Sequence, residues 1–157
     1  MRPDDERAGA LAAELDAWGQ QEEDIEIERE MLDGLGELIE LTKAVDRSGL
    51  PVFQTGHRVV GGEACHFTAP ASMPDVAGQP GGRLLLTGRR AIFVGGARGV
   101  AVPWHAIGNA SHVERDLVLV RADREELHRF RCNTFSDAFR GAFIARGLVA
   151  ARRGQPV

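Results

Sequence analysis

The second half of the chain consists of short apolar runs separated by links of only two to five residues, and this spacing limits its possible folds. Residues 83–87 and 90–94, for example, are joined by Gly88-Arg89 alone. A link of a few residues can join only antiparallel neighbours. The pattern therefore predicts a succession of antiparallel strands at 83–87, 90–94, 100–102, 107–113, 117–121 and 126–132.

Further strands and a closing helix complete the expected fold. Residues 59–60 and 64–69 predict one or two short strands, and residues 70–82, rich in proline and glycine, predict a loop. Thr134 and Asp137 resemble a capping box, so a helix follows with Phe139, Ala142, Phe143 and Ala150 on its apolar face. The fold class expected is α+β: N-terminal acidic helices, then a seven-stranded antiparallel, partly open barrel capped by a C-terminal helix.

The first third of the chain has a different composition. Residues 4–47 are rich in Ala, Glu, Leu and Asp and predict helix, with a break or bend near Gly19 and an end at Ser48-Gly49-Leu50-Pro51. Residues 1–49 hold 15 acidic and 5 basic side chains, a balance of −10, whereas residues 50–157 hold 8 acidic and 14 basic, a balance of +6. Two interpretations remain open: two solvated surfaces of opposite sign, or an acidic segment that lies on the basic one or competes for its ligand.

An apolar residue recurs at every seventh position of this helical segment: Leu11, Trp18, Ile25, Leu32 and Ile39. The companion positions after Leu15 are Glu22, Arg29 and Gly36, which does not indicate a long zipper. An amphipathic helix that packs on its own domain or on a partner helix is favoured instead. Gly34 and Gly36 each cost about 1 kcal/mol relative to alanine, so the helix needs support. The residues predicted to bind a partner are Trp18, Ile25, Leu32, Leu35 and Ile39.

Patterns typical of catalysis are missing from the sequence. Cys65-His66 and Ser111-His112 are neighbours in strands, where alternation sends them to opposite faces. There is no C-x-x-C pair, nucleophile elbow or phosphate-binding glycine loop. We therefore expect no enzyme, no cofactor and no metal site. Cys65 and Cys132 are interpreted as small buried thiols in a reducing compartment. Without a signal peptide or an apolar span, the expected location is cytoplasmic, with peripheral membrane contact as a variant.

Residues 82–93, GRLLLTGRRAIF, resemble the G-x-L-x-L-T-x-x-R-x-x-F hairpin of GRAM and bacterial PH-like domains. The continuation is also similar: VPWHAI at 102–107 resembles the family's strand ending in x-P-x-x-x-I, and residues 117–119 and 130–132 resemble its last two strands. The resemblance covers about residues 58–153. It implies seven strands arranged as two near-orthogonal sheets, with one end capped by the helix. The chain then divides into an acidic helical segment 1–49, a linker 50–57, a PH-like module 58–153 and a tail 154–157.

The hairpin tip is interpreted as turn chemistry, with Gly88 supplying a positive φ, in preference to a ligand role. Phosphoinositide-binding members of the family resemble one another in a basic first inter-strand loop. Here residues 66–79 contain no Lys or Arg, which disfavours specific phosphoinositide binding. Weak attraction to an anionic surface remains an alternative, through Arg83, Arg98, Arg121 and Arg124.

The favoured function is a non-enzymatic intracellular adaptor or scaffold. The PH-like module would bind a protein partner at an open sheet edge beside the C-terminal helix, while the N-terminal helices self-associate or dock. The alternative is a module that binds anionic membrane surfaces weakly and is covered by the acidic helices. Nucleic-acid binding is the weakest expectation, because a balance of +6 over the module is modest.

Overall fold

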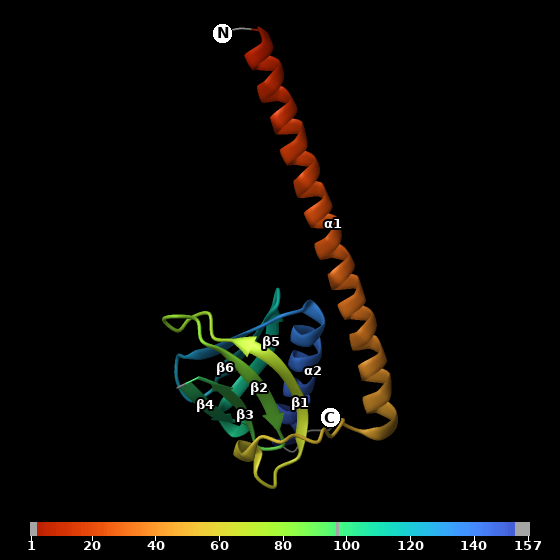
Figure 1. Ribbon diagram of the computed structural model, residues 1–157. Coiled ribbons are helices and arrows are strands. Elements are labelled where there is room, and N and C mark those ends of the chain that lie inside the picture. The colour runs from red at the N-terminus through yellow and green to blue at the C-terminus, as the bar shows by residue number, and fades with distance from the viewer. Residues whose placement is uncertain (1–2, 97, 153–157) are drawn as a thin grey trace.

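The computed structural model describes residues 3–96 and 98–152. Helix α1 (Pro3–Ser48) is continuous over 46 residues, and its N-terminal half extends away from the rest of the chain (Figure 1). The predicted break near Gly19 is therefore wrong. One glycine costs about 1 kcal/mol of helix, which is too little to interrupt a segment rich in Ala, Glu and Leu. A Cβ at Gly19 would meet nothing within 4 Å, so no neighbouring element bends the helix there.

The end of α1 lies where it was predicted. Gly49 has a φ of 80°, the left-handed conformation that closes many helices, and its N–H donates to the carbonyl of Val45 at 2.8 Å. Leu41, in the last turns of α1, and Leu50, just after them, both pack against the main core. Phe53 then forms an isolated bridge with Cys65. These contacts attach the C-terminal end of α1 to the module that follows.

Seven strands make up the module: β1 (Cys65–Ser72), β2 (Gly81–Thr87), β3 (Arg90–Gly95), β4 (Arg98–Pro103), β5 (Ile107–Val113), β6 (Asp116–Arg121) and β7 (Leu127–Cys132). From β2 onward, each strand begins and ends within two residues of its prediction. The earlier part differs, because residues 58–60 form the 3-10 helix η1 (Arg58–Val60) instead of a strand. Strand β1 also continues three residues into the predicted loop, and the last two of them, Ala71 and Ser72, pair with both β2 and β7.

The strands form one antiparallel sheet in the order β4-β3-β2-β1-β7-β6-β5. The junction of β1 and β7 rests on only two residue pairs, Ala71 with Cys132 and Ser72 with Arg131. The sheet is not closed, and the helix η2 (Trp104–Ala106) connects its two end strands, β4 and β5. The expected α+β class is thus confirmed. Where the resemblance implied two sheets, hydrogen bonding joins the strands into a single sheet with a short junction between its halves.

Helix α2 (Phe135–Arg152) packs against the sheet, with more contacts to β5 than to any other strand (Figure 1). Its predicted cap is present, because the N–H of Asp137 donates to Oγ1 of Thr134 at 3.1 Å. The predicted apolar face is partly wrong: Phe139 and Ala142 are buried, but Phe143 and Ala150 are only half-buried. Helix α2 lies between the sheet and α1, so its buried surface is wider than one stripe and shifted from the predicted one.

The main core lies between the sheet and α2. Phe93 of β3 and Phe130 of β7 stack with ring centroids 5.9 Å apart, and Trp104 belongs to the same buried cluster. Gly141 of α2 lies against Phe67 of β1, where a Cβ would come within 3.2 Å of a ring carbon. The sheet and α2 therefore form a closely packed body, and α1 docks on its helical side.

Candidate interaction surfaces

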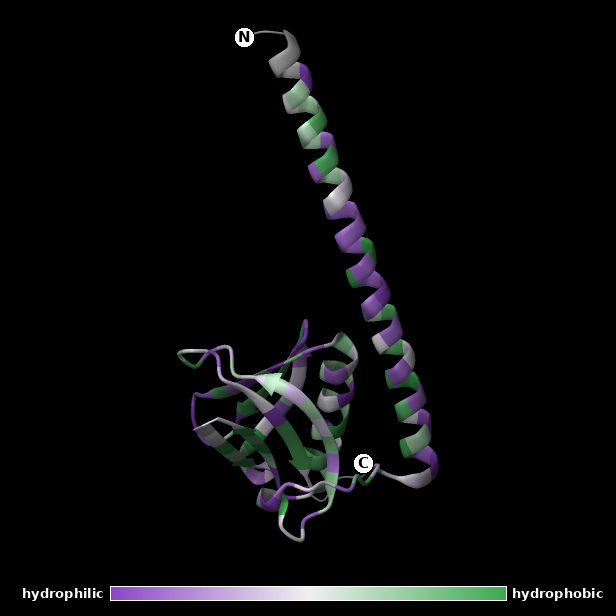
Figure 2. Cartoon of the chain, viewed as in Figure 1, coloured by the Kyte–Doolittle hydropathy of each residue, from purple (hydrophilic) through white to green (hydrophobic). Residues whose placement is uncertain are grey.

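The five side chains predicted as a partner-binding face are all exposed. Their exposed fractions are 65% for Trp18, 49% for Ile25, 66% for Leu32, 43% for Leu35 and 53% for Ile39. Leu11 and Leu15 are exposed to a similar degree. Figure 2 shows these hydrophobic positions continuing along the part of α1 that extends beyond the module. Isolated exposed apolar side chains are common, but a series of them along one helix indicates an interaction surface.

Gly34 identifies the side of α1 that faces the module. A Cβ at this position would lie 2.9 Å from the backbone nitrogen of Ser136 and 3.1 Å from Cδ2 of Phe139. Successive helical residues turn by about 100°, so the five residues of the seven-residue repeat lie about 140–220° from Gly34. They point away from the module. We call them the outward row: Leu11, Trp18, Ile25, Leu32 and Ile39.

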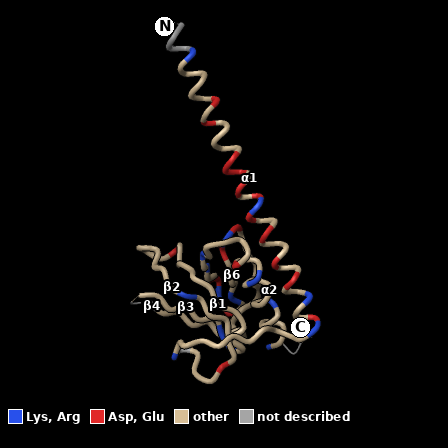
Figure 3. Tube along the Cα trace, turned by 45° about the vertical axis from the view of Figure 1, so that its right-hand side comes forward, with Lys and Arg blue, Asp and Glu red and all other residues tan. Residues whose placement is uncertain are grey.

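Polar contacts hold the inward side of α1 against the module. Ser136 Oγ donates to the carboxylate of Glu37, which also lies 3.8 Å from Nε of Arg140. Nearer the N-terminus, Arg115 donates to Glu30 from Nε at 3.0 Å and from Nη2 at 2.7 Å. The same guanidinium lies 4.7 Å from the centre of the Phe135 ring. Acidic side chains of α1 thus contact arginines of the module, in keeping with the second interpretation of the charge asymmetry. Figure 3 shows how many acidic positions lie along α1.

The N-terminal half of α1 has no such support. Residues 7–29 are all exposed, and Glu30 is the first position that is half-buried. An isolated helix is only marginally stable in water, because its nucleation is unfavourable and its backbone hydrogen bonds alone barely offset that free-energy cost. This part of α1 therefore presents apolar side chains without any packing against its own module.

A groove of about 650 Å³ opens where α1 leaves the module. Its apolar lining consists of Ile27, Met31, Phe135 and Phe139. The ring of His112 lies 4.5 Å from that of Phe139, and desolvation, followed by the charge of Arg146, lowers the pKa of this histidine. Among the charged lining residues, Arg115, Asp116 and Arg131 are paired with protein side chains, and Glu114 completes the charged lining, so few groups remain to orient a polar ligand.

Of the four arginines predicted to bind anions, the three whose side chains the structure describes do not converge on one site. Arg83 of β2 donates to Oγ1 of Thr68 at 3.0 Å. Arg121 lies 2.8 Å from Asp123, and its hydrogen bond lowers the pKa of Asp123 to about 2. Arg124 pairs with Glu126 at 2.5 Å. Arg98 begins β4, and its side chain lies outside the described part of the structure. Among these three described side chains, Arg121 and Arg124 both lie near Asp123, and each is paired with a carboxylate there.

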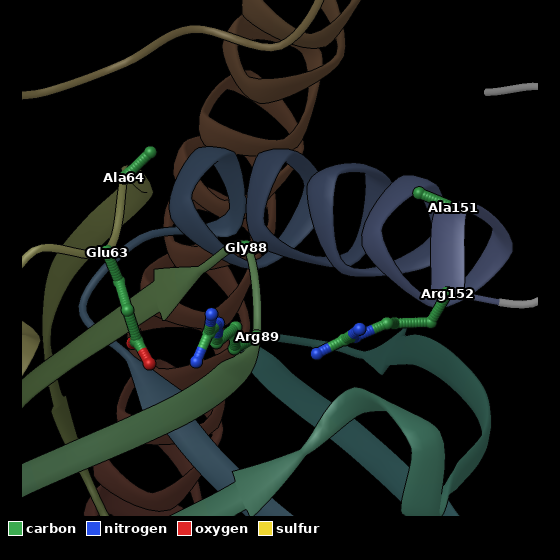
Figure 4. Close-up of a pocket in the computed structure, with 6 residues that line it drawn as sticks. All are labelled: Glu63, Ala64, Gly88, Arg89, Ala151 and Arg152. Carbon is green, nitrogen blue, oxygen red and sulfur yellow. The ribbon is translucent and has the colours of Figure 1, made fainter.

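Another arginine-lined pocket, of about 390 Å³, lies at the C-terminal end of α2 (Figure 4). Arg89 and Arg152 extend toward it together with Glu63, which pairs with Arg90 at 3.4 Å. The carbonyl end of a helix favours cations over anions. The acidic neighbour and the helix end both oppose the binding of an anion in this pocket.

The hairpin tip that carries the family resemblance has a structural role. Thr87 is fully buried; its Oγ1 donates to the carbonyl of Arg90 at 3.1 Å and accepts the N–H groups of Arg89 and Arg90 at 3.2 and 3.1 Å. The indole N–H of Trp104 donates to the carbonyl of Thr87 at 2.7 Å. Gly88 does not have a positive φ, so that prediction is wrong. The threonine side chain, and not glycine, closes this turn.

The two thiols are buried and free, as predicted. Burial raises the pKa of Cys65, and raises that of Cys132 to about 12. They lie apart, since Cys65 pairs with Thr87 whereas Cys132 pairs with Ala71, six residues further along β1. Within the described residues no three His, Cys, Asp or Glu side chains gather as a metal site. No helix in this part of the chain is long and apolar enough to cross a membrane.

The contacts that dock α1 were not identified from the sequence. Arg115 and Glu30 are 85 positions apart, and nothing in a single sequence links them. Gly34 was one sequence feature that pointed to this docking. A glycine inside a helix lowers helix stability, and close packing against another element can offset that loss. Thr87 was noted only as part of the hairpin motif, and its three hydrogen bonds depend on the shape of the folded turn.

No family model matches the sequence, and no curated protein is significantly similar to it. Among solved structures, the chain is similar to the C-terminal domain of an unknown protein from Leishmania infantum. The two share 9% identity and a TM-score of 0.49, over 58% of this chain and 89% of that one. A likeness of this degree carries no argument about function.

Proposed function

We propose that this protein is a non-enzymatic adaptor or scaffold, and that the outward row of α1 binds another helix. The observation that carries the proposal is the placement of the outward row: five apolar side chains on the side of α1 opposite Gly34, each about half or more exposed. From Glu30 onward the inward side is already occupied by the module, so along this part of α1 the outward side is the one available for binding.

The energetics favour such binding. Complete burial of a large apolar side chain contributes about 1.5–3 kcal/mol, so half-exposed residues such as Ile25 and Ile39 would each contribute about 1 kcal/mol on being covered. A partner helix would also support residues 7–29, which have no packing of their own. Five such contacts along one helix are sufficient to offset part of the entropic cost of association.

The module supplies a second, weaker candidate surface. Strand β5 is the last strand of the sheet and lies beside α2, which is the position where an extended peptide can add to a sheet. Nη1 of Arg146 lies 3.4 Å from the carbonyl oxygen of Ala110 in this strand, so part of its edge is already occupied. The outward row is therefore the stronger basis for the proposal.

The alternative of an anionic membrane surface has less support. Arg83, Arg121 and Arg124 are bound to neighbouring side chains, which reduces their capacity to attract phosphate groups. Helix α1 contacts Arg115 and Arg140 instead of these residues, so it does not serve as their electrostatic cover.

Gln20 and Gln21 offer a matched test of the adaptor proposal. Gln21 lies about 140° from Gly34 and Gln20 about 40°, so the two neighbours point to the outward and the inward side. A photoreactive amino acid placed at either position in the full chain, in the cells that produce it, should cross-link protein from Gln21 several times more than from Gln20. Mass spectrometry of the adducts identifies what was bound.

The adducts from Gln21 should disappear when Ile25→Asp is added, because a charge in the outward row cannot be buried without a partner. Equal yields from the two glutamines, or adducts that persist in Ile25→Asp, would contradict the proposal.

A further inference from the structure

We propose that the partner of α1 is a second copy of this chain, paired antiparallel, with Trp18 of each copy seated over Gly36 of the other. This inference rests on the proposed function, since it names the occupant of the outward row. It is carried by the shape of that row, by its charge, and by the unsupported half of α1.

Gly36 creates a depression in the outward face. It lies about 200° from Gly34, and a Cβ there would meet nothing within 4 Å, so no contact in the module explains it. The four residues Leu32, Leu35, Gly36 and Ile39 have the i, i+3, i+4, i+7 spacing of the hole that receives a side chain from a facing helix. A hole that contains glycine is the deepest available, and it fits the largest side chain.

Trp18 is the largest side chain of the outward row and is 65% exposed. In an antiparallel pair with Trp18 over this hole, the same register places Leu32 over the hole between Trp18 and Ile25 of the second copy. It also places Ile25 over the hole between Ile25 and Leu32. Each member of the row then fits between two row members of the other helix. A parallel pair would instead place Trp18 beside Trp18 and leave Gly36 opposite Gly36, one crowded layer and one empty layer.

The charge on the outward side permits this pairing. Although residues 1–49 have a balance of −10, the charged side chains among residues 7–48 that lie within about 60° of the outward direction are four basic and five acidic ones: Arg7, Arg29, Lys43 and Arg47, with Glu14, Glu22, Glu28, Glu40 and Asp46. In the proposed register Glu22 of one copy approaches Arg29 of the other, twice by symmetry. Arg7 and Lys43 approach at the two ends, where both are exposed and solvent screens the repulsion.

The antiparallel pairing would also provide packing for the N-terminal half of α1, which has none within its own chain. Residues 7–29 of each copy lie along about residues 25–46 of the other, the part of α1 that its module anchors. Because the outward row of each copy faces away from its own module, the proposed pairing places the two modules on opposite sides of the helix pair, where they do not collide.

Glycine substitutions test the register. Gly19 and Gly36 both lie in α1 with nothing within 4 Å, but Gly19 lies about 60° from Gly34, on the inward side. Leucine raises helix propensity equally at both positions. Sedimentation of the purified full chain should show a dimer whose dissociation constant rises at least tenfold in Gly36→Leu and changes less than twofold in Gly19→Leu. Equal effects of the two substitutions would overturn the seating of Trp18.

Cysteine pairs test the direction. Leu11 of one copy lies over the hole that contains Lys43 of the other, so Leu11→Cys and Lys43→Cys chains should cross-link when mixed and not when either is oxidised alone. Cross-linking of each variant with itself would show a parallel pair and overturn the proposal. Cys65 and Cys132 are buried and do not compete.

The mass of the unmodified chain separates this inference from the proposed function. A monomer at every concentration, together with Gln21 adducts to a different protein, would overturn self-pairing and leave the adaptor proposal standing. Loss of both the dimer and the Gln21 adducts would overturn the two together.

Discussion

Thr87 shows how a single buried side chain can explain a sequence motif. The hydroxyl makes three hydrogen bonds within the β2–β3 turn, and the backbone carbonyl of Thr87 accepts a hydrogen bond from the indole N–H of Trp104. The turn and the β4–β5 connection are thereby joined at one residue. The part of the chain that most resembles GRAM and PH-like hairpins is thus accounted for by folding, without reference to a ligand.

Substitution of Thr87 by valine should therefore destabilise the module. Valine keeps the volume but removes the three hydrogen bonds, and we expect a loss of about 2–3 kcal/mol in the free energy of unfolding. Gly88→Ala is the matched control: Gly88 has no positive φ, and a Cβ there would meet only Nε2 of His66 at 3.7 Å, so it should cost less than about 1 kcal/mol. Urea denaturation measures both, and equal losses would contradict this account of the turn.

Cys132 should make stability depend on pH in the alkaline range. Its pKa is raised to about 12 in the folded chain by burial, while an unfolded thiol titrates near 8.5–9. Between these values the unfolded state loses the proton and the folded state keeps it, so the free energy of unfolding falls as pH rises, by at most about 1.4 kcal/mol per pH unit.

The measurement is a series of denaturation curves from pH 8 to 11 for the natural chain and for Cys132→Ala. The natural chain should lose more stability over this range than the variant. Identical pH dependence would show that the thiol is not as buried as the structure places it.

At the scale of elements, the docking of α1 on α2 depends on one close approach. Gly34 lets the helices meet with Ser136 and Phe139 in contact, and the Glu30–Arg115 and Glu37–Ser136 contacts lie on either side along α1. Gly36, only two residues away, faces the opposite direction. The two glycines cost the helix the same in propensity and have different structural consequences.

Alanine at these two positions should therefore have opposite effects. In Gly34→Ala the new Cβ meets backbone atoms of α2, so α1 must shift and its inward contacts weaken. In Gly36→Ala the helix gains up to about 1 kcal/mol of propensity. Hydrogen exchange of the amides in residues 34–45 should become about tenfold faster in the first variant and should not become faster in the second. Faster exchange in both would show that the close contact at Gly34 is not what holds α1.

At the scale of the whole molecule, the chain consists of a packed module with a helix that is anchored at one end only. Leu41 and Leu50 join the core of the module, while residues 7–29 are exposed throughout (Figure 1). The module is therefore stabilised by its own core, whereas residues 7–29 of α1 have no packing within the same chain.

Truncation should reveal this separation. A chain that starts at Ile27 keeps Glu30, Gly34 and Leu41, and its melting temperature should lie within about 3 °C of the full-length Ile25→Asp chain. A chain that starts at Leu50 loses the docked part of α1, and a loss of about 2 kcal/mol should lower its melting temperature by about 8–16 °C. Calorimetry measures both, and similar values for the two truncated chains would show that α1 does not stabilise the module.

The sequence was sufficient for the local features. Link length determined that the strands after residue 82 are antiparallel neighbours, because a short link allows no other connection. Thr134 determined the start of α2, and Gly49 the end of α1, because caps act on the nearest backbone groups. The seven-residue repeat of the outward row was also visible, since helical periodicity is a property of the chain itself.

Only the tertiary structure decided how these parts are used. It showed that α1 packs through Gly34, that Thr87 closes the hairpin, and that the sheet is one body with a short β1–β7 junction. The docking of α1 and the β1–β7 junction depend on residues far apart in the chain meeting in space, as Glu30 and Arg115 do. The turn at Thr87 is local, but its geometry is set by the folded hairpin. The sequence placed apolar side chains along one stripe of a helix; the position of α2 made the opposite stripe the buried one and left the outward row exposed.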